Sequence, residues 1–317
     1  MIEITEWLHY STIALAVGIN SVGVGLGEGI TSSAALRAIN KQPKAKNEIS
    51  RIAILGTALI ETAAIMGVAI SIILLLGTKD NALSPFAALA EIGIALAICL
   101  SGFVIGIVSA LPAKEACLAV ARQPFFGEKI LRFMLITQSV IQTPIIFGFI
   151  IAMFIKNQAA DAQTIGHSMK LIAGGLCIGL GTIGPAIGLG NFTQVAVRGL
   201  GINRFAYPTL MTFMFISQAI IETPVIFALV TALLILVSPT TTIMGGIATL
   251  AAALCMGLGT IGPGSSSGKT ASAACHQIAL NPDIYSKVAN VSLFGQGLID
   301  TCAIYAFLIA IIMVLFQ

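Results

Sequence analysis

The chain alternates long apolar stretches with short polar connections, and its 317 residues contain eight such stretches. They run over residues 8–36, 52–77, 86–120, 130–155, 168–200, 207–237, 242–268 and 288–316. About 20 consecutive apolar residues are enough for a helix to cross the hydrocarbon core of a bilayer. The pattern therefore predicts an all-α membrane protein with eight transmembrane helices, several of which are long enough to extend into water.

The composition agrees with this prediction. Only 9% of the residues are charged, 57% are hydrophobic, and the mean hydropathy is +1.00, which excludes an ordinary soluble domain. The net charge of +3 comes without a basic stripe, so nothing favours nucleic-acid binding. The first stretch lacks a basic leader and carries Glu3 and Glu6, which favours a true span over a cleaved signal peptide.

Basic residues indicate how the chain lies in the membrane. The connections that follow the first, third, fifth and seventh stretches hold Arg37, Lys41, Lys44, Lys46, Arg51, Lys114, Arg122, Lys129, Arg132, Arg198, Arg204 and Lys287. The opposite connections hold only Lys79, Lys156 and Lys170. Because cytoplasmic loops carry an excess of lysine and arginine, we expect the first set in the cytoplasm and both termini on the other side.

One phrase recurs four times inside the apolar stretches. It reads GTALIETAAIM at 56–66, TQSVIQTPIIF at 137–147, SQAIIETPVIF at 217–227 and GQGLIDTCAIY at 295–305. Each copy places one acidic or amide residue directly before a threonine. These residues, here called the key residues, are Glu61, Gln142, Glu222 and Asp300. A carboxylate at mid-membrane costs about 2.5 to 3.5 kcal/mol on insertion scales, so its default interpretation is ion or proton transfer.

The recurrence divides the chain into four similar units. The key residues follow one another at intervals of about 80 residues, which is the length of two helices and one basic connection. We expect four helical hairpins, at residues 1–80, 81–158, 159–239 and 240–317. Because each hairpin contains an even number of spans, all four share one orientation, unlike the inverted repeats of many carriers.

The first helix of each hairpin carries a polar residue at a matching place. If Pro43, Pro124, Ala206 and Pro282 are equivalent, the positions fifteen residues earlier are Glu28, Ser109, Asn191 and Ser267. These residues lie in glycine-rich stretches, and glycine lets membrane helices approach closely. The second helices carry bulkier leucine, isoleucine, phenylalanine and methionine. This contrast predicts an inner layer of first helices and an outer, lipid-facing layer of second helices.

Together these features resemble the c subunit of F-type ATP synthases and the related V-type proteolipids. The resemblance rests on the glycine-rich first helix, the ARQP connection at 121–124 (weaker at 40–43), the mid-membrane carboxylate, and glutamine four residues before it at Gln138, Gln218 and Gln296. It covers essentially the whole chain as four c-like hairpins, whereas the ordinary F-type subunit has one hairpin.

The resemblance implies a rotor ring of several copies, surrounded by lipid in an energy-coupling cell or inner membrane. The carboxylates would carry H⁺ or Na⁺, a stator a subunit would displace the ion, and the rotor subunit would have no catalytic site or cofactor of its own. Two connections would face the central stalk, through Arg37, Gln42, Pro43, Arg122, Gln123 and Pro124. The alternative interpretation of these connections is a solvated loop that only obeys the positive-inside rule.

The transported ion stays open at this point. Threonine follows every key residue, as Thr62, Thr143, Thr223 and Thr301, and the first helices add Glu28, Ser109, Asn191 and Ser267. Hard cations prefer several oxygen ligands, so such sites suit sodium. Sodium-binding rings of the family, however, typically have a longer Gln or Glu in the first helix. A proton needs only the carboxyl group and one partner, which favours the proton slightly.

Hairpins 1 and 2 depart from the repeat. Gln142 cannot carry a proton through a binding cycle, so hairpin 2 is expected to be silent by itself, which would lower the number of ions per turn. Alternatively, Glu28 and Gln142 have exchanged roles and form one site between them. A third interpretation places Glu28 with Glu61, or with Asp300 of the next chain, as a two-carboxylate site, and a fourth makes Glu28 a structural glutamic acid.

Lys269 is a second unusual charge, two residues after Ser267 and close to mid-membrane depth. It either forms an ion pair with Asp300, which would remove hairpin 4 from transport, or extends toward the cytoplasm. The neighbouring GPGSSSGKT at 262–270 imitates a phosphate-binding loop, but Pro263 occupies a glycine position and no strand precedes it.

Two other function classes, an enzyme and a stand-alone channel or transporter, are less favoured by the sequence. The six cysteines lie in apolar helices without a CxxC pair, which is typical of packing residues. The three histidines are scattered, so no enzymatic constellation is evident. A stand-alone channel or secondary transporter with four parallel repeats is the alternative function, and a stable ring of copies in detergent would argue against it.

Overall fold

The computed structural model describes residues 2–77 and 84–316, and every segment of regular structure in these ranges is helical. Hairpin 1 contains α1 (Ile2–Lys41), the 3₁₀ turn η1 (Pro43–Ala45), α2 (Lys46–Ile60) and α3 (Thr62–Gly77). Hairpin 2 contains α4 (Pro85–Val108), α5 (Ala110–Arg122), η2 (Pro124–Phe126), α6 (Gly127–Ile141) and α7 (Thr143–Ala159). Hairpin 3 contains α8 (Ile165–Ile202), η3 (Arg204–Ala206) and α9 (Tyr207–Val237), and hairpin 4 contains α10 (Ile243–Gly259), α11 (Ile261–Leu280), η4 (Pro282–Ile284) and α12 (Tyr285–Leu315).

These helices form eight continuous rods, each long and apolar enough to cross a membrane, within the described part of the chain. The prediction of an all-helical integral membrane protein with eight spans is confirmed. Lys79, which contributed to the expected orientation, lies outside the described residues.

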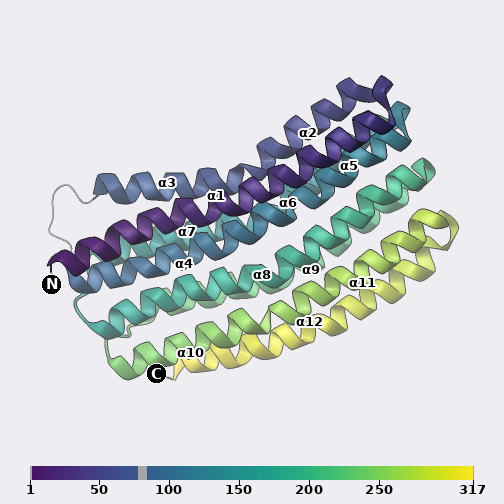
Figure 1. Ribbon diagram of the computed structural model, residues 1–317. Coiled ribbons are helices and arrows are strands. Elements are labelled where there is room, and N and C mark those ends of the chain that lie inside the picture. The colour runs from purple at the N-terminus through teal and green to yellow at the C-terminus, as the bar shows by residue number, and fades with distance from the viewer. Residues whose placement is uncertain (1, 78–83, 317) are drawn as a thin grey trace.

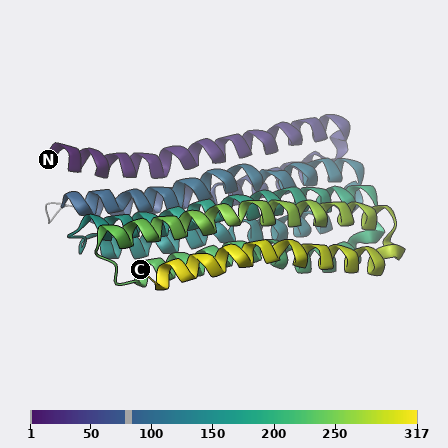
Figure 2. The same ribbon diagram turned by 90° about the horizontal axis from the view of Figure 1, so that it is seen from below.

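The rods lie side by side in two layers. One layer contains the first helices in chain order, α1, α4 with α5, α8, and α10 with α11; the other contains α2 with α3, α6 with α7, α9 and α12 (Figures 1 and 2). Each first helix packs against the first helices of its neighbours, and each second helix packs against its own first helix and adjacent second helices. The two expected layers are present; which of them faces lipid stays a prediction.

Glycine is required where the first helices meet. A Cβ atom added at Gly106 in α4 would lie 2.7 Å from the carbonyl carbon of Gly23 in α1, and one added at Gly184 in α8 would lie 2.5 Å from the carbonyl oxygen of Thr260. Real side chains do not approach backbone so closely. The absence of a side chain therefore lets the first helices touch backbone to backbone, as membrane helices with small residues do.

The tight turns correct one expected equivalence. The 3₁₀ turns begin at Pro43, Pro124, Arg204 and Pro282. Arg204, rather than Ala206, is therefore the third member of the set, and with it the key residue falls eighteen residues after the start of the turn in all four hairpins. The residue equivalent to Ser109 and Ser267 is then Leu189, which is fully buried. Asn191 lies two residues further, about 200° around the helix at 100° per residue.

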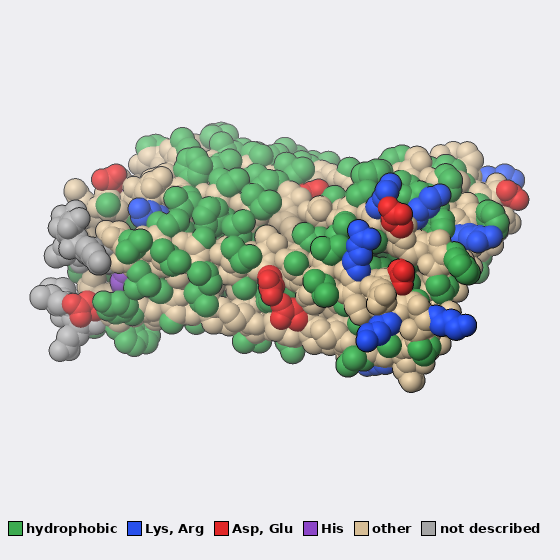
Figure 3. Space-filling view, turned by 90° about the horizontal axis from the view of Figure 1, so that it is seen from above, with side chains coloured by type: hydrophobic (Ala, Val, Ile, Leu, Met, Phe, Trp, Pro, Cys, Tyr) green, Lys and Arg blue, Asp and Glu red, His purple; other side chains and the backbone are tan. Residues whose placement is uncertain are grey.

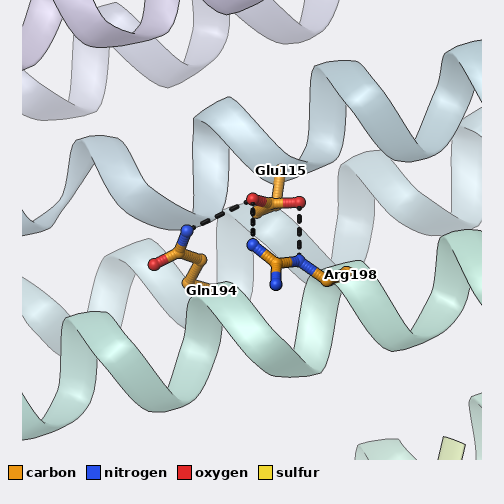
Figure 4. A network of polar contacts seen from close by, with 3 residues as sticks. All are labelled: Glu115, Gln194 and Arg198. Atoms are coloured by element: carbon orange, nitrogen blue, oxygen red, sulfur yellow. Dashed lines mark hydrogen bonds and ion pairs between the residues drawn. The ribbon is translucent and has the colours of Figure 1, made fainter. Parts of the chain in front are cut away.

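Lysine and arginine side chains gather at one end of the molecule, the end that carries the four turns (Figure 3). Near that end, the buried Glu115 of α5 accepts hydrogen bonds from Arg198 Nη2 at 2.8 Å, Arg198 Nε at 3.2 Å and Gln194 Nε2 at 3.2 Å, all from α8 (Figure 4). Toward the other end, His9 Nδ1 of α1 lies 2.7 Å from Glu91 Oε2 of α4, and both side chains are buried. These links join neighbouring hairpins, and residue spacing alone did not reveal them.

Candidate ion-binding sites

The four key residues lie in the second helices, about halfway along each rod, but they differ in exposure. Glu61 is exposed, Glu222 is half-buried, and Gln142 and Asp300 are buried at 4% and 7% exposure. In hairpins 1 and 2 the key residue falls between two helical segments, where α2 gives way to α3 and α6 to α7. In hairpins 3 and 4, α9 and α12 continue through it.

Asp300 has a partner in its own hairpin. Ser267 of α11 donates a hydrogen bond from Oγ to Asp300 Oδ1 at 3.2 Å. The sequence also suggested an ion pair between Lys269 and Asp300. The ion pairs among the described residues do not include this pair, and the Lys269 side chain is exposed. The reason is rotational, because two residues place Lys269 about 200° around α11 from Ser267.

Glu222 finds its hydroxyl partner in the preceding hairpin. The Thr143 side chain, which follows Gln142 at the start of α7, lies close enough to the Glu222 carboxylate to interact with it. The corresponding threonines of the last two hairpins bond to their own helices, Thr223 Oγ1 to the Ala219 oxygen at 3.1 Å and Thr301 Oγ1 to the Leu298 oxygen at 2.7 Å. Thr143 and Glu222 thus form a contact across a junction between hairpins.

Hairpin 1 brings two carboxyl groups together. The Glu28 side chain of α1 and the Glu61 side chain, which directly follows α2, lie close enough to interact electrostatically. Of the arrangements that the sequence left open for Glu28, the structure places it beside Glu61 of the same hairpin. Thr62, the next residue, is half-buried.

Gln142 stands in a different environment. Both polar atoms of its side chain are buried and have no partner among the described residues. Ser109 Oγ, between α4 and α5 of the same hairpin, is likewise unpartnered. An unpaired buried amide costs about 1 to 3 kcal/mol. At the position where the other hairpins carry a carboxylate, hairpin 2 therefore has polar groups but no ionisable side chain.

Comparison with known proteins decides the family. The family model for the C subunit of ATP synthase matches the chain four times in succession, at residues 12–74, 92–155, 172–235 and 250–313. The chain belongs to this ATP synthase C-subunit family. Each match contains one key residue, so the expected tandem organisation is confirmed.

Individual c subunits of ATP synthases match one quarter of the chain at a time. The ATP synthase c subunit of Campylobacter concisus is 44% identical over 77 residues, which are 24% of this chain and 76% of that protein. The ATP synthase c subunit of Aliarcobacter butzleri is 40% identical over 81 residues, 25% of this chain and 78% of that protein. Four units of this size thus follow one another in this chain, which, as a member of this family, is a non-catalytic membrane rotor component.

The glutamine four residues before the key residue joins neighbouring c-like hairpins. Gln138 Nε2 donates to the Gly56 oxygen of hairpin 1 at 3.2 Å and to the Ser109 oxygen at 2.8 Å. Gln218 Nε2 donates to the Thr137 oxygen of hairpin 2 at 3.3 Å. Gln296 Nε2 lies 3.3 Å from Ser217 Oγ of hairpin 3. In each case the partner lies five residues before the key residue of the preceding hairpin, so these glutamines set the register between hairpins.

Proposed function

We propose that this chain forms a rotor ring in which Glu61, Glu222 and Asp300 carry the transported ion and couple its passage to rotation. One observation carries the proposal: each carboxylate lies eighteen residues after the turn of its hairpin, halfway along an apolar rod, beside a polar group from a neighbouring helix. Burial in lipid favours the neutral form of such a group. Charge then appears only where a stator subunit supplies a polar environment.

The proton is the ion that these sites suit best. Among the described residues, Asp300 has one hydroxyl partner, Ser267, and Glu222 has one, Thr143. In hairpin 3 the first-helix position equivalent to Ser109 and Ser267 is held by Leu189, an apolar residue that cannot ligate a cation. Because sodium needs several oxygen ligands and a proton needs one acceptor, this poor ligand set supports proton transport.

Hairpin 2 carries no ion in this proposal. Gln142 has no titratable group, and Glu28 accompanies Glu61 instead of Gln142. Three carrier carboxylates then serve four hairpins. One turn of the ring then moves fewer ions than the ring has hairpins. ATP synthesis therefore requires a larger ion gradient, and this low ion-to-ATP ratio suits an ATP-driven pump.

The turn end is proposed to face the cytoplasm and the central stalk. Its excess of lysine and arginine supports the cytoplasmic orientation. Arg37, Pro43 and Arg122 are exposed there, while Gln42, Gln123 and Pro124 are half-buried. Phe125 and Phe205, each the second residue of its turn, are 103% and 77% exposed. Exposed aromatic side chains suit contact with another protein.

Carbodiimide labelling of the intact rotary complex tests the proposal. Dicyclohexylcarbodiimide reacts with protonated carboxyl groups in lipid, and mass spectrometry locates the adducts. We expect adducts at Glu61, Glu222 and Asp300, less labelling as pH rises, and no protection by Na⁺ at fixed pH. Glu222→Gln is expected to lose its own adduct and to stop ATP-driven proton uptake into liposomes.

Two results would contradict the proposal. Protection by millimolar Na⁺ at constant pH would show that sodium is the ion, and full proton uptake by Glu222→Gln would remove that residue from transport. Glu128→Gln is the matched control, since Glu128 is an exposed carboxylate paired with Arg132 near the turn and has no part in the sites.

A further inference from the structure

The first helix of hairpin 4 shows how one hairpin packs onto the preceding one. In α11, Gly264 and Gly268 lie against the Gly184–Pro185 and Gly188 backbone of α8, and Gly257 of α10 lies against Leu180. Counted from Pro282 at the turn, Gly257, Gly264 and Gly268 stand 25, 18 and 14 residues earlier. They mark the face that a first helix presents to the hairpin before it.

The same face of α1 is free of neighbours. Gly18, Gly25 and Gly29 stand 25, 18 and 14 residues before Pro43, and a Cβ atom at any of them would meet nothing within 4 Å. Three glycines at the same three positions are thus packed in hairpin 4 and open in hairpin 1. Since no other hairpin of the described chain covers it, this glycine face has the shape of a docking surface for the first helix of another hairpin.

The opposite end of the row of hairpins has the complementary open face. Gly23 of α1 stands 20 residues before the turn and packs against the Phe103 backbone of the following hairpin. Gly262, 20 residues before the turn of hairpin 4, has nothing within 4 Å. The two open faces are therefore the two halves of one repeating contact, and a second copy of this chain has the matching half.

Charges of opposite sign lie on these two faces. Leu111 of hairpin 2, 13 residues before its turn, has its Cδ1 atom 3.2 Å from where a Cβ of Gly190 in α8 would lie. Lys269 occupies that position in hairpin 4, and it is exposed. The position of Gly190 corresponds to Gly29, which directly follows Glu28. When two copies meet through the contact seen between hairpins 2 and 3, Lys269 of one copy lies near Glu28 of the next copy.

Between two copies, the second helices lack the glutamine hydrogen bond that joins the second helices of neighbouring hairpins within the chain. Hairpin 1 carries Thr57 in place of the bridging glutamine, and the Thr57 hydroxyl donates to its own helix, to the Ala53 and Ile54 oxygens. At the junction between copies, Thr57 of one copy would meet Gly295 in hairpin 4 of the other copy. Junctions within the chain are joined by an amide of Gln138, Gln218 or Gln296, and the junction between copies is not.

We propose that Lys269 of one copy pairs with Glu28 of the next copy at mid-membrane and sets the register between copies in the ring. The proposal rests on the proposed function, because it needs a ring. An unpaired lysine at that depth is costly, and a charge-assisted hydrogen bond to a carboxylate offsets the cost. Lys269 then supplies the counter-charge of Glu28, and Glu61 beside it is the carboxylate free to exchange a proton.

Charge reversal tests the pairing in the full-length protein. Lys269→Met and Glu28→Lys are each expected to lower the ring-to-monomer ratio in detergent by about tenfold or more, as seen by native mass spectrometry. The first leaves Glu28 without its partner, and the second places two lysines together. Lys269→Glu combined with Glu28→Lys is expected to restore the ring. Arg132→Met is the control, since Arg132 lies on hairpin 2 and away from the junction between copies.

A disulfide provides a second measurement that does not depend on charge. Val108 Cβ lies 2.8 Å from where a Cβ of Gly190 would lie, and the corresponding residues between copies are Ser266 and Gly29. Ser266→Cys with Gly29→Cys, in a Cys302→Ser background, is expected to give cross-linked chains on oxidation. Ser266→Cys with Gly18→Cys, at a different depth, is expected to give none.

The outcomes separate the two proposals. Rings that assemble unchanged with Lys269→Met and Glu28→Lys overturn the pairing and leave the proposed function intact. Single-hairpin c subunits between copies of this chain, seen in the mass of the ring, also overturn it. A wild-type chain that remains monomeric in the membrane contradicts the proposed function itself.

Discussion

The Gln138 amide donates a hydrogen bond to the Gly56 carbonyl oxygen at 3.2 Å and thereby joins the second helices of hairpins 1 and 2. The same amide also reaches the Ser109 oxygen of α4, where that helix gives way to α5. A single buried side chain therefore connects three helices at the depth of the key residues.

Gln138→Leu is expected to destabilise the protein by about 1 to 3 kcal/mol, because two carbonyl oxygens lose their donor. The free energy of unfolding in an SDS titration measures the effect. Gln163→Leu is the control, since Gln163 is exposed. Equal stability of the two variants would contradict a role for Gln138 in joining the hairpins.

Arg198→Met is expected to cost about 2 to 3 kcal/mol of unfolding free energy. The Glu115 side chain is only 2% exposed and would be left charged without its partner, although the 43% exposure of Arg198 moderates the loss. Glu115→Leu together with Arg198→Met is expected to recover most of the stability. A double variant as unstable as the single one would show that the buried charge is not the cause.

Gly188→Ala is expected to destabilise the contact between α8 and α11 by about 1 to 3 kcal/mol, since the added methyl group would overlap the Gly264 backbone. Gly297→Ala, in α12, meets nothing within 4 Å and is expected to leave stability unchanged or raise it by up to about 1 kcal/mol. Thermal unfolding in detergent compares them; a stable Gly188→Ala protein would disprove the close approach.

Gln142→Glu is expected to add a fourth carrier to the chain. The buried side chain lies at the equivalent depth, and burial favours the neutral form of a carboxyl group there. Mass spectrometry after carbodiimide treatment should find a new adduct at position 142, and none at position 163 in Gln163→Glu. A variant that pumps with an unchanged proton-to-ATP ratio would argue against the silent role of hairpin 2.

Lys269→Met is expected to leave the carbodiimide labelling of Asp300 unchanged in detergent-dispersed chains, because Asp300 bonds to Ser267 and not to Lys269. Ser267→Ala is the informative comparison, since it removes the hydroxyl donor and is expected to alter the pH dependence of labelling at Asp300 alone. A large change of Asp300 labelling in Lys269→Met would restore the ion-pair interpretation.

Which residues correspond between the hairpins was harder to predict than the presence of four hairpins. Hydrophobic length and the recurring phrase predicted eight spans in four units, because both are properties of local sequence. The match of Ala206 to the prolines failed by two residues, since hairpin 3 has no proline at the start of its turn and begins it with Arg204. That shift made Leu189, and not Asn191, the residue equivalent to Ser109 and Ser267, because the alignment depends on where the turn begins.

The membrane class, the four-fold repeat and the depth of each key residue follow from the amino-acid sequence, because they depend on the length of the apolar stretches and the rise of a helix. Which polar groups meet depends on helix packing: Glu28 with Glu61, Thr143 with Glu222, and Ser267, not Lys269, with Asp300. These pairs depend on how each helix is rotated about its axis. Each residue turns a helix by 100°, so partners depend on how neighbouring helices are turned and packed.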